Sequence, residues 1–203
     1  MTIELILSMA IGYILGSVPF ALVIGKVFYK KDVRNYGSKN LGGSNTGRVL
    51  GRNAGLAVMT LDLLKVTFAI FLVSFMQNKE VTVVAAGISA AIGHCFPLFA
   101  RFKGGKAVAT MYGFLFGMVV VAGYSFWIFL FPLFVFLIVL YLWKIVALAS
   151  IFSAIANTVF IYFVTGSWSL TMASFAFTVL IVVRHRKNLE RMRKHEENKI
   201  SWM

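Results

Sequence analysis

Two segments of this 203-residue sequence combine glycine with cationic side chains, a composition typical of anion-binding loops. The first, residues 34–48, contains three glycine sites, several small hydroxyl and amide side chains, three cations, and no Asp or Glu. Glycine lets backbone N–H groups converge on one point, and the planar fork of Arg matches phosphate oxygens. The segment therefore predicts a phosphate cradle. The alternative is a solvated basic loop of the kind that the positive-inside rule places beside membranes.

The second segment, residues 102–110, has two lysines around a pair of glycines, and a helix is expected to begin just after them. A helix N-terminus beside glycine and lysine favours a bound anion. The spacing of a nucleotide-binding P-loop is absent. Because both segments are expected on the same face of a membrane, the sequence predicts sites for two phosphates.

Asp62 and Lys65 are three residues apart in an otherwise apolar stretch, so on a helix they share one face. Charges inside a membrane span are costly and usually face each other or a cavity. One interpretation is an ion pair that ties helices together. The other is support for the anion site, in which Asp62 orients a loop cation or Lys65 contributes to binding.

The three histidines have no Cys or carboxylate at metal-ligand spacing, so a metal site is not expected. His185 lies among cations, with Asn188 about one helical turn later, and is a candidate for proton transfer or hydrogen bonding. The alternative for His185 is a surface histidine at a helix end. His94 precedes Pro97 and is expected either to orient the second segment or to take part in the chemistry.

Apolar helices must position these residues, because 60% of the chain is hydrophobic and 13% is charged. Long uncharged runs are typical of polytopic helical membrane proteins. We predict an all-α integral membrane protein of one domain, residues 1–203, with about seven transmembrane helices. Pro19 is expected to kink the first span, and Asn53 to cap the second. The spans are expected near residues 3–28, 54–75, 81–100, 107–122, 126–142, 145–164 and 169–183.

The distribution of cations predicts the orientation. The loops after the first, third, fifth and seventh spans are basic, whereas the others are neutral or uncharged. The positive-inside rule then places the N-terminus outside and the C-terminus in the cytoplasm. The net charge of +13 fits anionic lipid headgroups and anionic substrates better than nucleic acid, because no soluble basic domain is present.

Together these motifs resemble those of the bacterial acyl-phosphate:glycerol-3-phosphate acyltransferases, the PlsY family. The resemblance covers nearly the whole chain. Its strongest parts are the runs 37–48, 93–110 and 184–191, together with the pair Asp62 and Lys65. The chain departs from the family at Lys39, Ala107 and His195, where glycine is usual, at Ser44, where threonine is usual, and at Val146-Ala147, where two serines are frequent.

The resemblance implies an enzyme of the inner membrane whose active site faces the cytoplasm. It would transfer an acyl group from acyl phosphate to the primary hydroxyl of glycerol 3-phosphate, giving lysophosphatidic acid and phosphate in an early step of phospholipid synthesis. The expected partners are these two substrates, membrane lipids and an enzyme that makes acyl phosphate, with no nucleic acid. No cofactor or metal is expected, and no protein nucleophile is required because an acyl phosphate is already activated.

The predicted site residues fall into three groups. The catalytic group comprises Ser38, Arg48, His185 and Asn188. The substrate-binding group comprises Ser17, Asn40, Gly42, Gly43, Ser44 and Asn45, with Lys103, Gly104, Gly105 and Lys106 assigned to the second phosphate. The supporting group comprises Asp62, Lys65, His94 and Glu197.

Three other functions are weighed against this one. A transporter for small anions would use the same cations but should place them along a path through the bilayer, whereas here almost all lie at one end. A CDP-alcohol phosphotransferase needs a carboxylate-rich metal motif, and the seven acidic residues are mostly scattered. A non-catalytic membrane scaffold leaves two glycine-basic loops unexplained.

Overall fold

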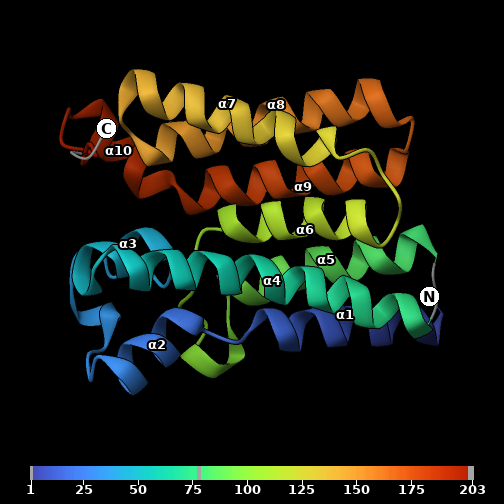
Figure 1. The fold of residues 1–203 in the computed structure, drawn as a ribbon, viewed down its shortest axis with the longest axis horizontal. Coiled ribbons are helices and arrows are strands. Elements are labelled where there is room, and N and C mark those ends of the chain that lie inside the picture. Colours follow the sequence, from blue (N-terminus) through green and yellow to red (C-terminus); the bar gives the residue numbers. More distant parts are fainter. Residues whose placement is uncertain (1, 77–78, 201–203) are drawn as a thin grey trace. The chain divides into compact units, whose positions relative to one another are not determined.

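The computed structural model describes residues 2–76 and 79–200, and every regular element in these ranges is a helix (Figure 1). The chain forms two compact units, residues 1–122 and 123–203, and each is described by itself. That they act as a single domain stays a prediction. The first unit contains α1 (Ile3–Gly16), α2 (Phe20–Phe28), η1 (Val33–Asn35), α3 (Gly43–Leu50), α4 (Arg52–Met76), α5 (Glu80–Cys95), η2 (Leu98–Ala100) and α6 (Val108–Val120). The second contains α7 (Trp127–Trp143), α8 (Val146–Thr165), α9 (Trp168–Arg184) and α10 (Arg186–Arg193).

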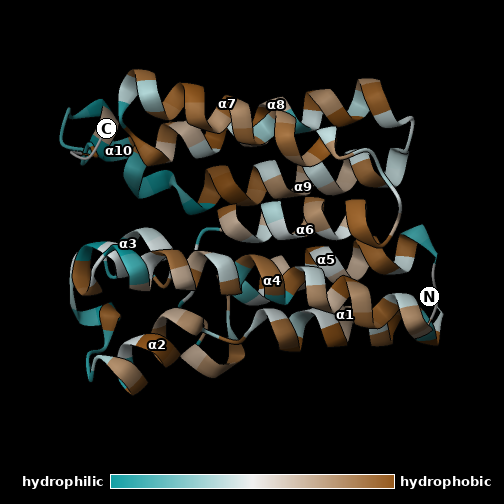
Figure 2. Ribbon diagram, in the orientation of Figure 1, coloured by the Kyte–Doolittle hydropathy of each residue, from teal (hydrophilic) through white to brown (hydrophobic). Residues whose placement is uncertain are grey.

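Apolar side chains cover most of the long helices, and hydrophilic residues gather at α3, α10 and the connections (Figure 2). Four helical segments among the described residues are long and apolar enough to cross a bilayer: 3–28, 52–76, 80–100 and 146–165. The pair α9 and α10, bent by 55°, makes a fifth if it counts as one span. Helices α6 and α7 are apolar but shorter. The prediction of seven spans, like that of their orientation, therefore stays a prediction.

A break between α1 and α2 interrupts the first apolar segment, as Pro19 predicts. Ser17 follows the last turn of α1, and α2 begins directly after Pro19. Proline has no N–H to donate and its ring clashes with the preceding turn, which favours a break in the helix at this position. The break leaves the carbonyl of Val18 outside the helical hydrogen-bond pattern, and Lys65 of α4 donates to it at 2.9 Å.

Helix α3 lies within the stretch that the sequence predicts to be a loop, so that prediction is wrong there. Its glycine, serine, asparagine and threonine have poor helix propensity. Close packing on α4 compensates, because a Cβ on Gly55 would lie 2.7 Å from the Cα of Gly47. The prediction of Asn53 as a helix cap is also wrong. Helix α4 begins at Arg52, and the carbonyl of Gly51 accepts from the N–H of Gly55 at 3.1 Å.

Small residues let α1 and α5 approach closely, as is common between membrane helices. A Cβ added to Gly12 would lie against the carbonyl of Ala86, and one on Gly16 against that of Ala90. At the end of this contact, a Cβ on Gly93 would lie 3.0 Å from the N–H nitrogen of Ser17. This packing holds the α1–α2 break beside the last turn of α5, where His94 lies.

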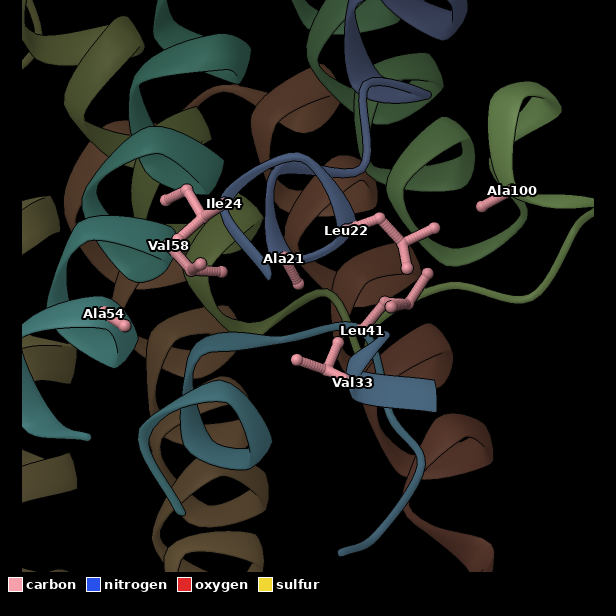
Figure 3. Packing of buried hydrophobic residues seen from close by; sticks show 8 residues of the cluster. All are labelled: Ala21, Leu22, Ile24, Val33, Leu41, Ala54, Val58 and Ala100. Atoms are coloured by element: carbon pink, nitrogen blue, oxygen red, sulfur yellow. The ribbon is translucent and has the colours of Figure 1, made fainter. Parts of the chain in front are cut away.

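One apolar cluster joins the two glycine-basic segments of the first unit (Figure 3). Leu41 comes from the first segment, Val33 directly precedes that segment, and Ala100 comes from η2, just before the second. The cluster also contains Ala21, Leu22 and Ile24 of α2 with Ala54 and Val58 of α4. The cluster therefore holds the first segment and η2, the helix that leads into the second segment, at the same end of the first unit.

In the second unit, α7, α8 and α9 pack as successive neighbours. The hydroxyl of Ser153 in α8 donates at 2.8 Å to the carbonyl of Pro132, the proline inside α7. Thr158 and Thr178 share a hydrogen bond of 2.9 Å between α8 and α9. After α10 the chain returns to α7, where the N–H of Ile200 donates to the carbonyl of Lys144 at 2.8 Å.

Candidate functional site

The first loop, residues 29–51 between α2 and α4, is ordered around the side chain of Asn45. Its Oδ1 accepts the N–H of Ser38 at 2.8 Å, and its Nδ2 donates to the carbonyls of Val33 at 3.1 Å and Tyr36 at 3.3 Å. The residue is 1% exposed. These bonds use both donors of the amide and one position on its oxygen. Asn45 therefore shapes the first loop; its predicted contact with phosphate stays a prediction.

Asp32 and Arg34 form a two-pronged ion pair at the start of this loop. Arg34 Nη2 lies 2.6 Å from Asp32 Oδ2, and the N–H of Arg34 also donates to Asp32 Oδ1 at 3.0 Å. Hydrogen bonds from Arg34, with a smaller contribution from the charge of Lys26, lower the pKa of Asp32 from 3.8 to about 2. One of the cations of residues 34–48 is thus neutralised within the loop.

The exposed polar face of the first loop is built on α3. Ser44 and Arg48 are both exposed and lie four residues apart, so they share one face of the helix. Arg48 forms no ion pair within the part of the chain that the structure describes. Exposed Ser38 and half-buried Asn40 precede α3, and Gly42 is its N-cap. Gly43 is buried, and a Cβ there would lie against Met59, so its role is packing against α4.

The second loop, residues 101–107 between η2 and α6, is shaped by its backbone. Arg101 and Phe102 both have left-handed φ angles, of 55° and 57°. The N–H of Gly105 donates to the carbonyl of His94 at 3.0 Å. A Cβ on Gly104 would lie against that same carbonyl, and one on Gly105 against His94 Nε2. Only glycine therefore fits at 104 and 105 without displacing the end of α5.

The lysines of the second loop differ in their surroundings. Lys103 is exposed and forms no ion pair in the described ranges, whereas Lys106 is half-buried. Ala107, the N-cap of α6, is buried and has a left-handed φ of 61°. The loop thus presents Lys103 beside a backbone turn that is packed directly on His94.

Behind the second loop lies a buried network of Asp62, Lys65 and His94. Lys65 Nζ is 2.7 Å from Asp62 Oδ1, 3.1 Å from His94 Nδ1 and 2.9 Å from the carbonyl of Val18. The predicted ion pair is present, and it includes a histidine 29 residues away in sequence. Ser17, predicted to bind substrate, is also buried here, and its hydroxyl has no partner among the described residues.

An apolar groove of about 470 Å³ runs along the first unit beside this network. Leu15 and Val18 contribute from the end of α1, Leu64 and Phe68 from α4, and Val120 from α6. Lys65 also lines the groove, and its ammonium lies 5.7 Å from the centre of the Phe20 ring. The groove is therefore apolar along its length, with a cation at one point of its wall.

The tail cluster lies in the second unit. His185 is buried, and its Nδ1 is 2.8 Å from the carbonyl of Ile181. Because a carbonyl only accepts hydrogen bonds, Nδ1 carries the proton, and in the neutral ring Nε2 carries the lone pair. Asn188 Nδ2 donates to Glu197 Oε1 at 2.8 Å, and Arg191 Nε donates to Glu197 Oε2 at 2.7 Å. Glu197 thereby orients the Asn188 amide, and its supporting role in the reaction stays a prediction.

Comparison with known proteins identifies the family. The model of the family described as glycerol-3-phosphate acyltransferase matches residues 6–195 of this chain. The chain belongs to this family. A glycerol-3-phosphate acyltransferase of Listeria monocytogenes is 45% identical over 100% of both chains. One of Enterococcus faecalis is 39% identical over 98% of this chain and 93% of its own.

Two solved structures of a member of this family, the integral membrane protein PlsY, resemble the chain. The glycerol 3-phosphate form has a TM-score of 0.88 at 31% identity and covers 97% of this chain and 96% of that one. The lysophosphatidic acid form has a TM-score of 0.85 at 30% identity, covering 97% and 95%. The predicted resemblance and the all-helical, integral membrane fold class are thus confirmed.

The structure brings part of the predicted site together within one unit. The first loop, the second loop and the Asp62–Lys65–His94 network all belong to residues 1–122, whereas His185, Asn188 and Glu197 belong to residues 123–203. Sequence reasoning missed the Asp32–Arg34 pair, although its two-residue spacing was a usable signal. It also missed the carbonyl of Val18, which no side-chain pattern could have revealed.

Proposed function

We propose that this protein transfers an acyl group from acyl phosphate to the primary hydroxyl of glycerol 3-phosphate. The hydroxyl oxygen attacks the acyl carbonyl carbon, the bond from that carbon to the phosphate oxygen breaks, and lysophosphatidic acid and inorganic phosphate are released. Membership of the glycerol-3-phosphate acyltransferase family and the likeness to PlsY in its two ligand forms support this proposal.

The observation that carries the proposal furthest is one apolar cluster that contains residues of the first loop and Ala100 of η2, the residue directly before the second loop. Both proposed substrates carry a phosphate, and each loop offers an exposed cation, Arg48 or Lys103, with no ion pair in the described ranges. Two anions held side by side turn a bimolecular reaction into an effectively unimolecular one. Fixed cations and backbone N–H groups also stabilise the negative charge that develops on the attacked carbonyl oxygen.

We assign the phosphate of acyl phosphate to Ser38, Ser44 and Arg48 of the first loop. The phosphate of glycerol 3-phosphate is assigned to the second loop, residues 103–106. No nucleophile of the protein is needed, because the acyl group arrives with a good leaving group. The hydroxyl proton passes either to a phosphate oxygen of the donor or to His185, the histidine that the sequence predicts to be catalytic.

The acyl chain is assigned to the apolar groove between α1, α4 and α6. Its lining is almost wholly apolar, as a hydrocarbon chain requires. The break between α1 and α2 borders the groove at Val18 and Phe20, close to the network that supports the second loop. An acyl chain in this position would leave its carbonyl at the end of the first unit that carries both loops.

The enzyme should be expressed at the inner membrane, purified in detergent and given palmitoyl phosphate with glycerol 3-phosphate. We expect phosphate release and lysophosphatidic acid in equal amounts, the lipid being identified by mass spectrometry. Omission of glycerol 3-phosphate is the first control, and replacement of acyl phosphate by an acyl thioester is the second. Full activity with the thioester alone would contradict the proposed donor.

The same preparation tests the transporter alternative. Reconstituted into vesicles, it should carry no phosphate across the bilayer when acyl phosphate is absent. Rapid phosphate uptake without lysophosphatidic acid formation would replace the proposed transferase by an anion transporter. A periplasmic reporter fused to each terminus would test the predicted orientation, with the N-terminus outside and the C-terminus in the cytoplasm.

A further inference from the structure

The ammonium group of Lys65 has three N–H donors, and the structure supplies three acceptors for them. These are Asp62 Oδ1 at 2.7 Å, the carbonyl of Val18 at 2.9 Å and His94 Nδ1 at 3.1 Å. The side chains of Lys65 and Asp62 are only 4% and 3% exposed. A lysine whose every donor is directed at a fixed acceptor has one defined position. It ties together the α1–α2 break, α4 and the end of α5.

This arrangement also fixes the state of the His94 ring. An ammonium group has no acceptor, so a hydrogen bond between Lys65 and His94 uses the lone pair of Nδ1, a nitrogen that also lies 3.5 Å from Asp62 Oδ1. The neutral ring then carries its proton on Nε2. That nitrogen lies at Gly105, where an added Cβ would clash with it. Lys65 therefore holds the imidazole in the position against which the second loop packs.

The contact from His94 to the second loop involves both its ring and its backbone. The carbonyl of His94 accepts the N–H of Gly105 at 3.0 Å, and a Cβ on Gly104 would lie against the same carbonyl. The loop follows two consecutive left-handed residues, Arg101 and Phe102, a conformation that side chains other than glycine adopt at a cost. Such a backbone persists only where the surrounding structure holds it.

We propose that Asp62, Lys65 and His94 form a positioning network that sets the affinity of the second loop for glycerol 3-phosphate. None of the three is assigned a contact with substrate. Their part is to hold the turn at Gly104 and Gly105 in the form that binds an anion, as partners behind a binding group commonly do. The inference rests on the proposed function, because it assumes that this loop binds the phosphate of glycerol 3-phosphate.

The central experiment uses the double variant Asp62→Asn/Lys65→Met. Removing one member of a buried ion pair leaves an uncompensated charge and can prevent folding, whereas removing both charges is often well tolerated. The double variant should therefore fold and melt near the wild-type temperature. Its dissociation constant for glycerol 3-phosphate, measured by calorimetry without any acyl donor, should nevertheless rise by about tenfold. Wild-type affinity in the folded double variant would overturn the proposal.

His94→Asn tests the other end of the network. The asparagine oxygen can still accept from Lys65 near the position of Nδ1, but the atoms that reach Gly105 are gone. We expect a similar loss of affinity, together with faster hydrogen exchange at the N–H of Gly105, because the imidazole no longer supports the turn. Unchanged exchange in residues 101–107 together with unchanged affinity would contradict the inference.

Thr178→Val is the matched control for a loss of stability alone. It removes a hydrogen bond between α8 and α9 in the second unit, whereas the network belongs to the first unit. We expect a lower melting temperature with wild-type affinity for glycerol 3-phosphate. A tenfold loss of affinity in this control would show that binding follows stability and would overturn the positioning role.

The wild-type protein separates failure of the inference from failure of the proposed function. If it binds glycerol 3-phosphate and the network variants bind equally well, the positioning role is wrong while the proposed function stands. If the wild type binds none at millimolar concentration, the assignment of this substrate fails, and with it the inference that rests on it. Weaker binding in both network variants, with the control unchanged, supports both.

Discussion

The two loops of the first unit are held in different ways. In the first loop, one buried side chain, Asn45, bonds to three backbone groups, and an ion pair between Asp32 and Arg34 closes the start. In the second loop, the backbone itself packs on His94, and glycine at 104 and 105 makes the approach possible. A loop held by side chains can lose one bond at a time. The conformation of a loop held by close backbone packing depends on the residues that it packs against, here His94.

The cations of the two loops show a matching difference. In the first loop, Arg34 is neutralised by Asp32, whereas Arg48 on α3 is exposed and has no ion pair among the described residues. In the second loop, exposed Lys103 lies just before the glycine pair. Residues with proposed binding roles and residues that support the backbone are therefore intermixed in the first loop but lie in separate layers in the second.

The largest expected effect comes from Arg48→Ala. Loss of the guanidinium should lower kcat/KM by at least about a hundredfold, because it removes a fixed donor to phosphate and to developing charge. Steady-state phosphate release measures it, and a melting curve should stay at the wild-type position. Arg52→Ala, an exposed arginine at the start of α4, is the control. Equal losses in both variants would mean that the first loop is only an orientation signal.

Lys103→Ala should act mainly on binding. We expect KM for glycerol 3-phosphate to rise about tenfold with a smaller change in kcat, because a single charge–phosphate contact is lost from a loop whose backbone is held elsewhere. Initial rates at varied glycerol 3-phosphate measure it. An unchanged apparent affinity would assign that phosphate to another part of the site.

Asn45→Ala tests the loop that is held by side chains. Three backbone groups would lose their partner, which should lower the free energy of unfolding by about 2 kcal/mol. Activity should fall with it, because Ser38 is positioned through its N–H bond to Asn45. Thermal unfolding in detergent measures the change. A variant with wild-type stability would contradict the role of Asn45 as the centre of the first loop.

Replacing residues with left-handed φ angles by glycine should stabilise both loops slightly. Lys39 has a φ of 59° and Ala107 one of 61°. Glycine at either position should raise the free energy of unfolding by about 0.5–1 kcal/mol. This gain is the backbone strain that glycine relieves, reduced by the entropy that glycine adds to the unfolded chain. Lys39→Ala keeps the strain and serves as the control. Equal melting temperatures for Lys39→Gly and Lys39→Ala would refute this account.

The smallest effect concerns pH at the start of the first loop. The pKa of Asp32 is lowered from 3.8 to about 2 in the folded chain, so the ion pair stabilises the fold fully above about pH 4. That contribution is lost as the pH falls toward 2, and it should be below about 1 kcal/mol for a pair this close to solvent. Asp32→Asn should therefore flatten the acid side of the stability curve. An identical acid limb in this variant would contradict the effect.

Much of the fold follows from local sequence pattern. Apolar runs predicted the long helices to within a few residues, and Pro19 predicted the break between α1 and α2, because proline removes a helix donor wherever it occurs. Helix α3 could not be predicted in this way. Its residues have poor propensity, and the helix exists because Gly43 and Gly47 pack closely on Gly55 of α4. The prediction that Asn53 caps α4 was wrong because the helix begins one residue earlier, at Arg52, directly after Gly51.

Three positions at which the resemblance predicts glycine share one backbone conformation. Lys39, Ala107 and His195 all have left-handed φ angles. The resemblance predicts glycine at these three positions, and glycine adopts a left-handed φ angle without strain. At these positions a side chain costs free energy, and the surrounding contacts must compensate for it.

For the site, the residue types and spacings determined the membrane character, the two glycine-basic loops and the charge pair on α4, because each depends on neighbours along the chain. Tertiary structure decided the rest. It placed the first loop and η2 on one apolar cluster, joined Lys65 to a histidine 29 residues away and bonded the Asn45 side chain to the backbone of the first loop. Such contacts depend on which helices lie side by side, and close packing between distant segments cannot be read from local pattern.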